Sequence, residues 1–198
     1  MLKTLLLGAA VLIGYGPMAQ AAYTVTLDQV GSDVVATGSG TIDLAGLIFQ
    51  ATGDDGAHVA PDISDIATGP ATVTDVDFYF GVTGPAAFGS GGFTFANSGS
   101  GDIVGILPST EHLEVPLGYV SGSALSDTST YTNATFASLG ATPGTYTWTW
   151  APTNTPGALD DSFTLEIGVA AVPEPASLAL LCAGLVGLGV LHRRRKPV

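Results

Sequence analysis

The feature that most restricts the fold of this chain is a two-residue alternation of apolar and polar side chains. It is clearest at residues 145–150, Thr-Tyr-Thr-Trp-Thr-Trp, where an extended strand places the aromatic side chains on one face and the threonines on the other. Phe163, Leu165 and Ile167 repeat the pattern. A helix cannot bury such a pattern, because its side chains return to one face only every three or four residues. The alternation therefore predicts half-buried β-strands with the aromatic side chains in the core.

Similar short segments recur through the middle of the chain and are separated by Gly, Pro, Asn and Asp. The predicted strands are residues 23–27, 71–80, 92–96, 112–115, 130–136, 145–150 and 162–169, with a further strand beginning at 41–44. The helix formers Lys, Arg, Glu and Gln are scarce in the same region. Many short strands joined by turns predict an all-β domain, an antiparallel sandwich or a jelly-roll-like fold.

The predicted domain is a polyanion. All five Lys and Arg lie at the two ends of the chain, whereas of the 17 Asp and Glu only Glu174 lies outside residues 22–172. Nucleic acid is excluded as a partner, because phosphate binding requires Lys or Arg. The single cysteine, Cys182, lies in a C-terminal apolar run, so no internal disulfide can stabilise the domain and the core alone must do so.

The N-terminus has the order of a secretory signal peptide. Lys3 is followed by the apolar residues 5–13 and then by the small-residue pattern Ala19-Gln20-Ala21. This order predicts a signal helix at residues 1–21, with Ala19 and Ala21 defining a cleavage site after Ala21. Residues 22–171 are then the exported domain.

The C-terminus, residues 172–198, has three parts. Val172-Pro173-Glu174-Pro175 is followed by the uncharged apolar residues 176–191 and then by the basic cluster 192–196. The apolar part predicts a short transmembrane helix, about 24 Å long against a hydrocarbon thickness of about 30 Å. Basic residues stay on the cytoplasmic side, so the acidic domain lies outside. The prolines favour an extended segment that a protease can bind.

This three-part tail resembles the PEP-CTERM sorting signal of Gram-negative bacteria. The resemblance implies that a membrane-embedded exosortase, a protease or transpeptidase, recognises Pro173, Glu174 and Pro175, and that Arg193, Arg194 and Arg195 form the stop signal. It also implies an inner-membrane-anchored precursor that is processed and passes to the periplasm, the cell surface or the extracellular space. Bacteria with such proteins typically make exopolysaccharide or biofilm, so exopolysaccharide is a further implied partner.

Catalytic motifs are missing from the sequence of the domain. It contains no Gly-x-Ser-x-Gly nucleophile elbow, no His-Glu-x-x-His zinc motif and no phosphate-binding loop. The domain is therefore interpreted as non-enzymatic and as needing no cofactor. His112 and Glu114 would share one face of a strand but supply only two metal ligands. For Ca²⁺ the candidate ligands are Asp54, Asp55 and Asp62, in a segment that also holds His58; the alternative is a set of solvated acidic loops.

Three functions remain open for the exported domain. The first is a structural protein of the cell surface or of a biofilm or exopolysaccharide matrix. The second is a carbohydrate-binding module, which would expose Tyr146, Trp148 and Trp150 as a flat platform for sugar rings. The third is a secreted hydrolase, which would place His58 or His112 in a cleft beside a carboxylate and a hydroxyl.

Overall fold

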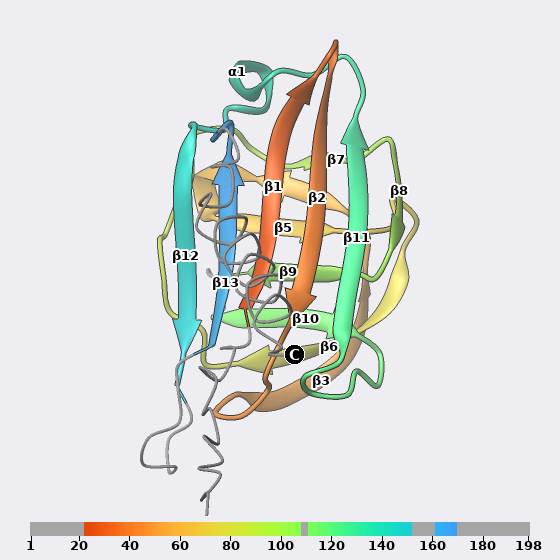
Figure 1. Ribbon diagram of the computed structural model, residues 1–198, viewed down its shortest axis with the longest axis vertical. Coiled ribbons are helices and arrows are strands. Elements are labelled where there is room, and N and C mark those ends of the chain that lie inside the picture. Colours follow the sequence, from red (N-terminus) through yellow and green to blue (C-terminus); the bar gives the residue numbers. More distant parts are fainter. Residues whose placement is uncertain (1–21, 108–110, 152–160, 170–198) are drawn as a thin grey trace, which may run out of the picture.

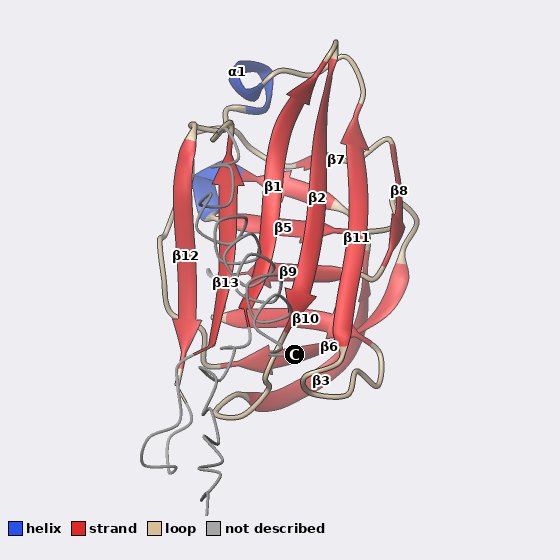
Figure 2. Cartoon of the chain, in the orientation of Figure 1, coloured by secondary structure: helices blue, strands red, loops and turns tan. Residues whose placement is uncertain are grey.

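The computed structural model describes residues 22–107, 111–151 and 161–169. Two β-sheets pack face to face, and the strands of one cross those of the other at a steep angle (Figure 1). Almost all of the regular structure is β-strand (Figure 2). The predicted all-β sandwich is confirmed, and its crossed arrangement belongs to the orthogonal class of sheet packing.

Sheet A has six strands and sheet B has seven. In spatial order, sheet A contains β12 (Gly144–Trp150), β13 (Asp161–Ile167), β1 (Ala22–Val30), β2 (Asp33–Thr41), β11 (Ala124–Tyr131) and β8 (Ser98–Gly101). Sheet B contains β3 (Ile48–Asp55), β6 (Thr74–Phe80), β10 (His112–Pro116), β9 (Val104–Leu107), β5 (Asp65–Thr68), β4 (His58–Ala60) and β7 (Thr94–Phe95). A short 3₁₀ helix, η1 (Pro61–Ile63), and one helical turn, α1 (Phe136–Leu139), complete the described elements.

The last strand of the chain lies inside sheet A. β13 pairs with β12 on one side and with β1 on the other, and its pairing with β1 is parallel, from Ala22 opposite Ser162 to Leu27 opposite Ile167. The other strand pairs in the described residues are antiparallel. The fold therefore joins the beginning and the end of the domain side by side, an arrangement that hairpin signals in the sequence do not predict.

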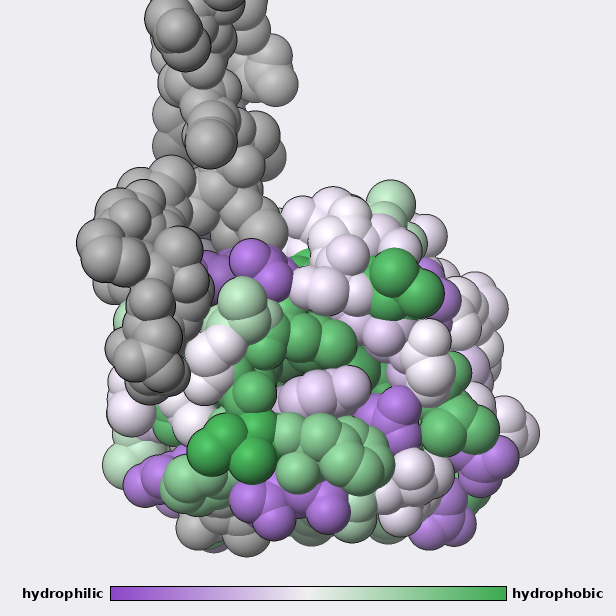
Figure 3. All heavy atoms as spheres, turned by 90° about the horizontal axis from the view of Figure 1, so that it is seen from below, coloured by the Kyte–Doolittle hydropathy of each residue, from purple (hydrophilic) through white to green (hydrophobic). Residues whose placement is uncertain are grey.

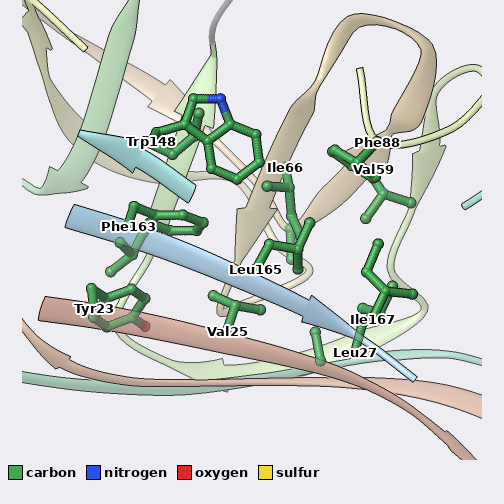
Figure 4. Packing of buried hydrophobic residues seen from close by; sticks show 14 of the residues in the cluster. Tyr23, Val25, Leu27, Val59, Ile66, Phe88, Trp148, Phe163, Leu165 and Ile167 are labelled. Carbon is green, nitrogen blue, oxygen red and sulfur yellow. The ribbon is translucent and has the colours of Figure 1, made fainter. Parts of the chain in front are cut away.

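The core lies between the two sheets. β1 and β13 point alternate side chains toward sheet B, where they meet Val59 and Ile66 (Figure 4). The core residues of these two strands are Tyr23, Val25, Leu27, Phe163, Leu165 and Ile167, and all of them are buried. Trp148 closes one side of this layer, edge-on to Phe163 with ring centroids 5.9 Å apart. Each large apolar side chain buried in this way contributes about 1.5–3 kcal/mol to folding.

Most predicted strands are confirmed. Residues 23–27, 112–115, 145–150 and 162–167 lie in β1, β10, β12 and β13. The prediction at 71–80 holds from Thr74 onward, and that at 92–96 only for Thr94 and Phe95. Strong alternation of large side chains marks the confirmed segments, because burying one face of a strand requires that pattern.

The strand predicted to begin at 41–44 is wrong. β2 ends at Thr41. Beyond it, the backbone N–H groups of residues 42, 43 and 44 donate to side chains, namely the Tyr119 hydroxyl, the Asp161 carboxylate and the Ser121 hydroxyl. The backbone groups that would have joined a ladder are therefore satisfied by distant side chains, and the segment leaves the sheet.

The strand predicted at 130–136 is also largely wrong. β11 ends at Tyr131, and Asn133 adopts a left-handed backbone conformation with φ 54°. Thr135 then caps α1, accepting a hydrogen bond from the Ser138 N–H while the Ser138 hydroxyl accepts one from the Thr135 N–H. This capping box fixes a helical start at a sequence whose apolar pattern also suits a strand.

The predicted signal peptide at 1–21 and the predicted transmembrane helix at 176–191 lie outside the described residues. Within the described part of the chain, no helix has the length and apolar character needed to cross a membrane.

Candidate functional site

The face of sheet B turned away from sheet A is partly closed. Along β10, Leu113 belongs to the core, so its neighbour Glu114 projects from the opposite face, together with its partner residues Phe78 and Gly105. That face would normally meet solvent, yet Glu114 is 0% exposed. The reason is that sheet B curls until the end of β3 meets the start of β4. There the Asp55 Oδ1 lies 3.4 Å from the His58 Nδ1.

Four ionisable side chains meet inside this curl and form what we call the acid–histidine cluster: Asp55, His58, Asp65 and Glu114. The His58 Nε2 lies 3.0 Å from the Asp65 Oδ1, and its Nδ1 lies 2.9 Å from the Gly56 carbonyl oxygen. Phe93 stacks on the imidazole with ring centroids 4.2 Å apart. His58 is only 1% exposed, whereas the Asp55 side chain at the rim of the cluster is 20% exposed.

The cluster has a definite charge state near neutral pH. Burial lowers the pKa of His58, but the hydrogen bonds to Asp55 and Asp65 outweigh it and raise the pKa to about 10. Burial opposes ionisation of Asp55 as well, yet the bond to His58 leaves its pKa below the ordinary value. Burial, followed by the nearby Asp55 carboxylate, raises the pKa of Glu114 well above the ordinary value. These directions describe a His58 imidazole that holds its proton beside Asp55, and a Glu114 carboxyl group that gives up its proton less readily than a free one.

This arrangement favours a structural role for the cluster, as ion pairs that link neighbouring strands, over a role in proton transfer. A protonated His58 cannot act as a general base, and its two ring nitrogens are already occupied. The ion pairs connect β4 to β5 and to the end of β3. Neither carboxyl oxygen of Glu114 has a hydrogen-bond partner among the described residues, and a Cβ atom at residue 105 would lie 2.4 Å from the Glu114 Oε1. Gly105 therefore makes the space that this carboxyl group fills.

The predicted calcium ligands are not brought together. Asp54 lies opposite Asp75 in the β3–β6 ladder, Asp62 lies in η1, and Asp55 contacts His58. In the part of the chain that the structure describes, no group of three or more His, Cys, Asp or Glu is arranged to hold a metal ion. The sequence indicated Asp55 and His58 because they are neighbours. It paired Glu114 with His112 and did not predict that Glu114 and Asp65 join Asp55 and His58, because only the curl of sheet B brings these residues together.

His112 lies near the cluster but outside it. It lines a cavity of about 400 Å³ together with Gln50, Ala51, Phe78 and Leu107. Phe78 and Phe80 contact its ring edge-on, with centroids 6.2 and 5.9 Å away. His112 and Glu114 share a face of β10 as predicted, but Glu114 is buried opposite Phe78 while His112 faces the cavity. Burial lowers the pKa of His112, and Glu111 partly offsets this effect.

Within residues 22–107, 111–151 and 161–169, neither histidine has the neighbours expected in a hydrolase. Among the described residues, neither His58 nor His112 has a Ser or Thr hydroxyl as a hydrogen-bond partner. His58 does have carboxylate neighbours, but it lies beneath Phe93 and not in an open cleft.

The aromatic side chains of β12 are core residues, as the alternation predicted. Trp148 is 0% and Trp150 is 3% exposed. Their indole N–H groups donate to the Pro85 and Asp43 carbonyl oxygens, and the partly buried Tyr146 donates to the Thr142 carbonyl oxygen. The alternative of an exposed Tyr146, Trp148 and Trp150 platform is therefore wrong, because this face of β12 is turned toward sheet B.

The outer face of sheet A carries rows of hydroxyl side chains. We call it the hydroxyl face; its members are Thr24, Thr26, Thr37, Ser39, Thr41, Ser98, Ser100, Ser126, Thr128, Thr130, Thr145, Thr147, Thr149, Ser162 and Thr164. In one row Thr147, Thr164, Thr24, Ser39 and Ser126 are successive partners across five strands. A shallow hollow of about 390 Å³ opens beside β2, β11 and β8.

Sequence reasoning found only the part of this face that lies on β12. The threonines of residues 145–150 were predicted to share the solvent side, and all three are exposed. The remaining rows depend on the register between strands, which no segment shows by itself. Two charged residues lie within the rows: Glu166, between Thr145 and Thr26, and Asp28, in the row that ends at Ser98.

Comparison with known proteins places the sorting signal. A family model described as the PEP-CTERM protein-sorting motif matches residues 171–196. No curated protein and no solved structure matches the chain. The predicted recognition residues Pro173, Glu174 and Pro175 and the stop signal Arg193 to Arg195 fall within the match and lie outside the described residues, as do Ala19 and Ala21 of the predicted signal peptide.

The motif determines how the protein is handled by the cell. A PEP-CTERM signal implies export, a precursor stage anchored in the membrane, and processing by an exosortase, which is itself a membrane enzyme. The sandwich of residues 22–169 is the cargo that precedes this signal. The chain therefore carries a PEP-CTERM sorting signal in its C-terminal region, which marks it as an exosortase substrate.

Proposed function

We propose that the exported domain is a non-enzymatic structural protein of the cell surface or of an exopolysaccharide matrix. The observation that carries the proposal is the hydroxyl face, which spans sheet A with rows of Thr and Ser. Each hydroxyl both donates and accepts hydrogen bonds, so such a face suits extended contact with a hydrated, hydroxyl-bearing polymer. The acidic character of the rest of the domain keeps it soluble and disfavours nucleic acid.

The position of the sorting motif supports the same role. β13 ends at Ile167, and the match to the motif begins at residue 171. The strand that runs into the motif is held between two neighbours in sheet A. An exosortase acting on the tail would therefore transfer or release the sandwich as one folded unit.

The role of the tail is tested by substituting its recognition residues. In a host that contains an exosortase, Glu174→Ala, or replacement of Arg193 to Arg195 by Ala, should leave unprocessed precursor in the membrane. Immunoblots of membrane and extracellular fractions measure this, and Glu166→Ala, which removes a carboxylate from the folded domain, serves as the control. Unchanged processing of both tail variants would contradict the assignment of these residues.

The matrix role is tested on the processed protein. We expect it to remain with the exopolysaccharide fraction, and we expect a triple variant, Thr24→Val, Thr147→Val and Thr164→Val, to pass largely into the medium. Valine preserves the β-branched shape and removes the hydroxyl. Thr132→Val, an exposed position in a turn beyond β11, is the matched control. Equal retention of the triple variant and the wild type would count against the hydroxyl face.

The same experiment separates a structural role from a carbohydrate-binding module. A module binds an isolated oligosaccharide saturably at one site, whereas a structural face gives retention that grows with polymer length. Binding should also be measured with and without Ca²⁺, since acidic loops can bridge to anionic polymers through divalent cations. Saturable binding of a short oligosaccharide would favour the module.

A further inference from the structure

The two sheets have four edges, and three of them are short or covered. β7 has two residues and β8 has four, all Ser or Gly. β12 is longer, but Thr83 and Thr149 exchange two backbone hydrogen bonds at its end, and Trp148 donates to Pro85 in the same segment. Short strands and covering segments are the usual ways in which proteins prevent strands from pairing between molecules.

β3 is the fourth edge and lacks these protections. It has eight residues and, among the strands that the structure describes, pairs only with β6. Residues 48–52 are all exposed, with Ile48 at 61% and Phe49 at 52%, and contain neither a charge nor a proline. A bulge between Phe49 and Ala51 leaves Gln50 without a partner residue in β6, and it is the one irregularity that this edge carries against pairing. The free edge therefore offers unpaired backbone groups beside exposed apolar side chains.

The surroundings of β3 favour a protein partner. Figure 3 looks onto the end of the molecule where β3 lies, and apolar side chains gather there among polar ones. On β3 itself, Ile48 and Phe49 expose large apolar side chains. A strand added to β3 would thus gain apolar contacts as well as a hydrogen-bond ladder.

We infer that β3 of one molecule pairs antiparallel with β3 of a second copy, which joins the two B sheets into one. Charge selects this direction. Asp54 and Asp55 lie at one end of β3; a parallel pair would set each beside its own copy, whereas an antiparallel pair sets them beside the uncharged end of the other strand. A twofold pair of identical strands also closes on itself and leaves no free edge for further growth.

A basic segment of another protein is the competing occupant. It would bind through Asp54 and Asp55, but Asp55 already contacts His58, and the exposed residues 48–52 offer it no opposite charge. The two occupants predict opposite salt effects. Two acidic copies repel each other, so salt strengthens their association by screening, whereas salt weakens a basic–acidic contact. The inference does not depend on the matrix role.

Cysteine scanning of the full-length chain tests the pairing. Single cysteines are placed at each of residues 48–55 in a Cys182→Ser background, the chain is produced in an exosortase-containing host, and disulfide-linked dimers are read on non-reducing gels. In an antiparallel pair only residues next to the twofold axis meet their own copies within disulfide distance. We expect one strong maximum between residues 49 and 52. No dimer at any position, or equal dimers at all eight, would overturn the proposal.

A charge variant tests the affinity on the processed protein. Phe49→Asp should weaken the dimer about tenfold or more, because in the antiparallel pair residue 49 lies beside Asp54 and Asp55 of the second copy and like charges repel. Phe95→Asp is the matched control, since Phe95 is an equally exposed phenylalanine, at 62%, on the short edge strand β7; its dimer should be unchanged. Analytical ultracentrifugation at low and high NaCl measures both. A wild-type monomer at all salt concentrations, or an unchanged Phe49→Asp dimer, would contradict the inference.

Discussion

Glu114 shows how one side chain can set the pH behaviour of its surroundings. Its carboxyl group is 0% exposed, and among the described residues neither oxygen has a hydrogen-bond partner. Burial raises its pKa well above the ordinary value. The folded state therefore holds a proton that the unfolded state releases at a lower pH, and the stability linked to that proton is lost as the pH rises.

Replacing Glu114 by Gln should remove this loss. Glu114→Gln keeps the shape of the side chain but cannot ionise, so we expect it to stabilise the protein at pH 8, on the order of 1–3 kcal/mol. The difference should shrink toward pH 4, where the wild-type carboxyl group is protonated in both states. Urea unfolding at several pH values measures the effect. Glu111→Gln, at an exposed position on the other side of His112, is the control, and an equal gain in both variants would contradict the explanation.

β12 shows how the alternation of buried and exposed side chains determines which residues of a strand contribute to stability. Its buried residues include Trp148, which contacts Phe163 and donates to the Pro85 carbonyl oxygen, while its threonines face solvent. Gly84 leaves room for this indole, since a Cβ atom there would lie 2.3 Å from the Trp148 Cδ1. Besides its hydrogen-bond ladder with β13, the strand packs against the core through one face only.

Truncating a buried side chain on that face should lower the free energy of unfolding substantially. Trp148→Ala leaves a large cavity and an unpaired carbonyl group, and we expect it to reduce the free energy of unfolding by about 3–5 kcal/mol. Thr145→Ala, on the exposed face of the same strand, should change it by less than about 1 kcal/mol. Thermal and denaturant unfolding measure both. Similar losses in the two variants would show that burial does not separate the two faces of β12.

The sequence predicts elements better than it predicts what brings them together. Strands with strong alternation, such as residues 145–150, were found because one-sided burial demands that pattern. Residues 41–44 and 130–136 were mispredicted, since side-chain hydrogen bonds to the backbone and a capping box override a weak apolar pattern. The acid–histidine cluster and the hydroxyl face were missed for a different reason. Both depend on the register and curl of the sheets, which arise between segments distant in the chain.

For the molecule as a whole, buried carboxyl groups favour mildly acidic conditions. Burial raises the pKa of both Asp127 and Asp161 to about 6, although hydrogen bonds, from the Tyr23 hydroxyl to Asp127 and from the Asp43 N–H to Asp161, oppose the shift. Their protonated forms stabilise the fold below the ordinary value of 3.8, and this stability is lost as the pH rises through about 6. The lowered pKa of Asp55 has the opposite effect: the ionised carboxylate stabilises the fold, and this stability is lost as the pH falls through the lowered pKa.

We therefore expect the melting temperature to be several degrees higher at pH 5 than at pH 8. A change of 1 kcal/mol corresponds to roughly 2–4 °C for a domain of this size. Added NaCl should narrow the difference, because it screens the repulsion among the ionised carboxylates at pH 8. Calorimetry at the two pH values measures this, and Asp127→Asn should flatten the profile. A higher melting temperature at pH 8 would refute the sign of the effect.

The parallel pairing of β1 with β13 has a consequence for the order of events during translocation. In an export that starts at the predicted signal peptide, β1 would lack one of its two neighbours until Ile167 has emerged. By then only the tail with its sorting motif remains behind. The core can therefore form completely only after β13 has emerged. The chain remains unfolded while it passes through a narrow translocation channel, and it folds when the sorting motif reaches the exosortase.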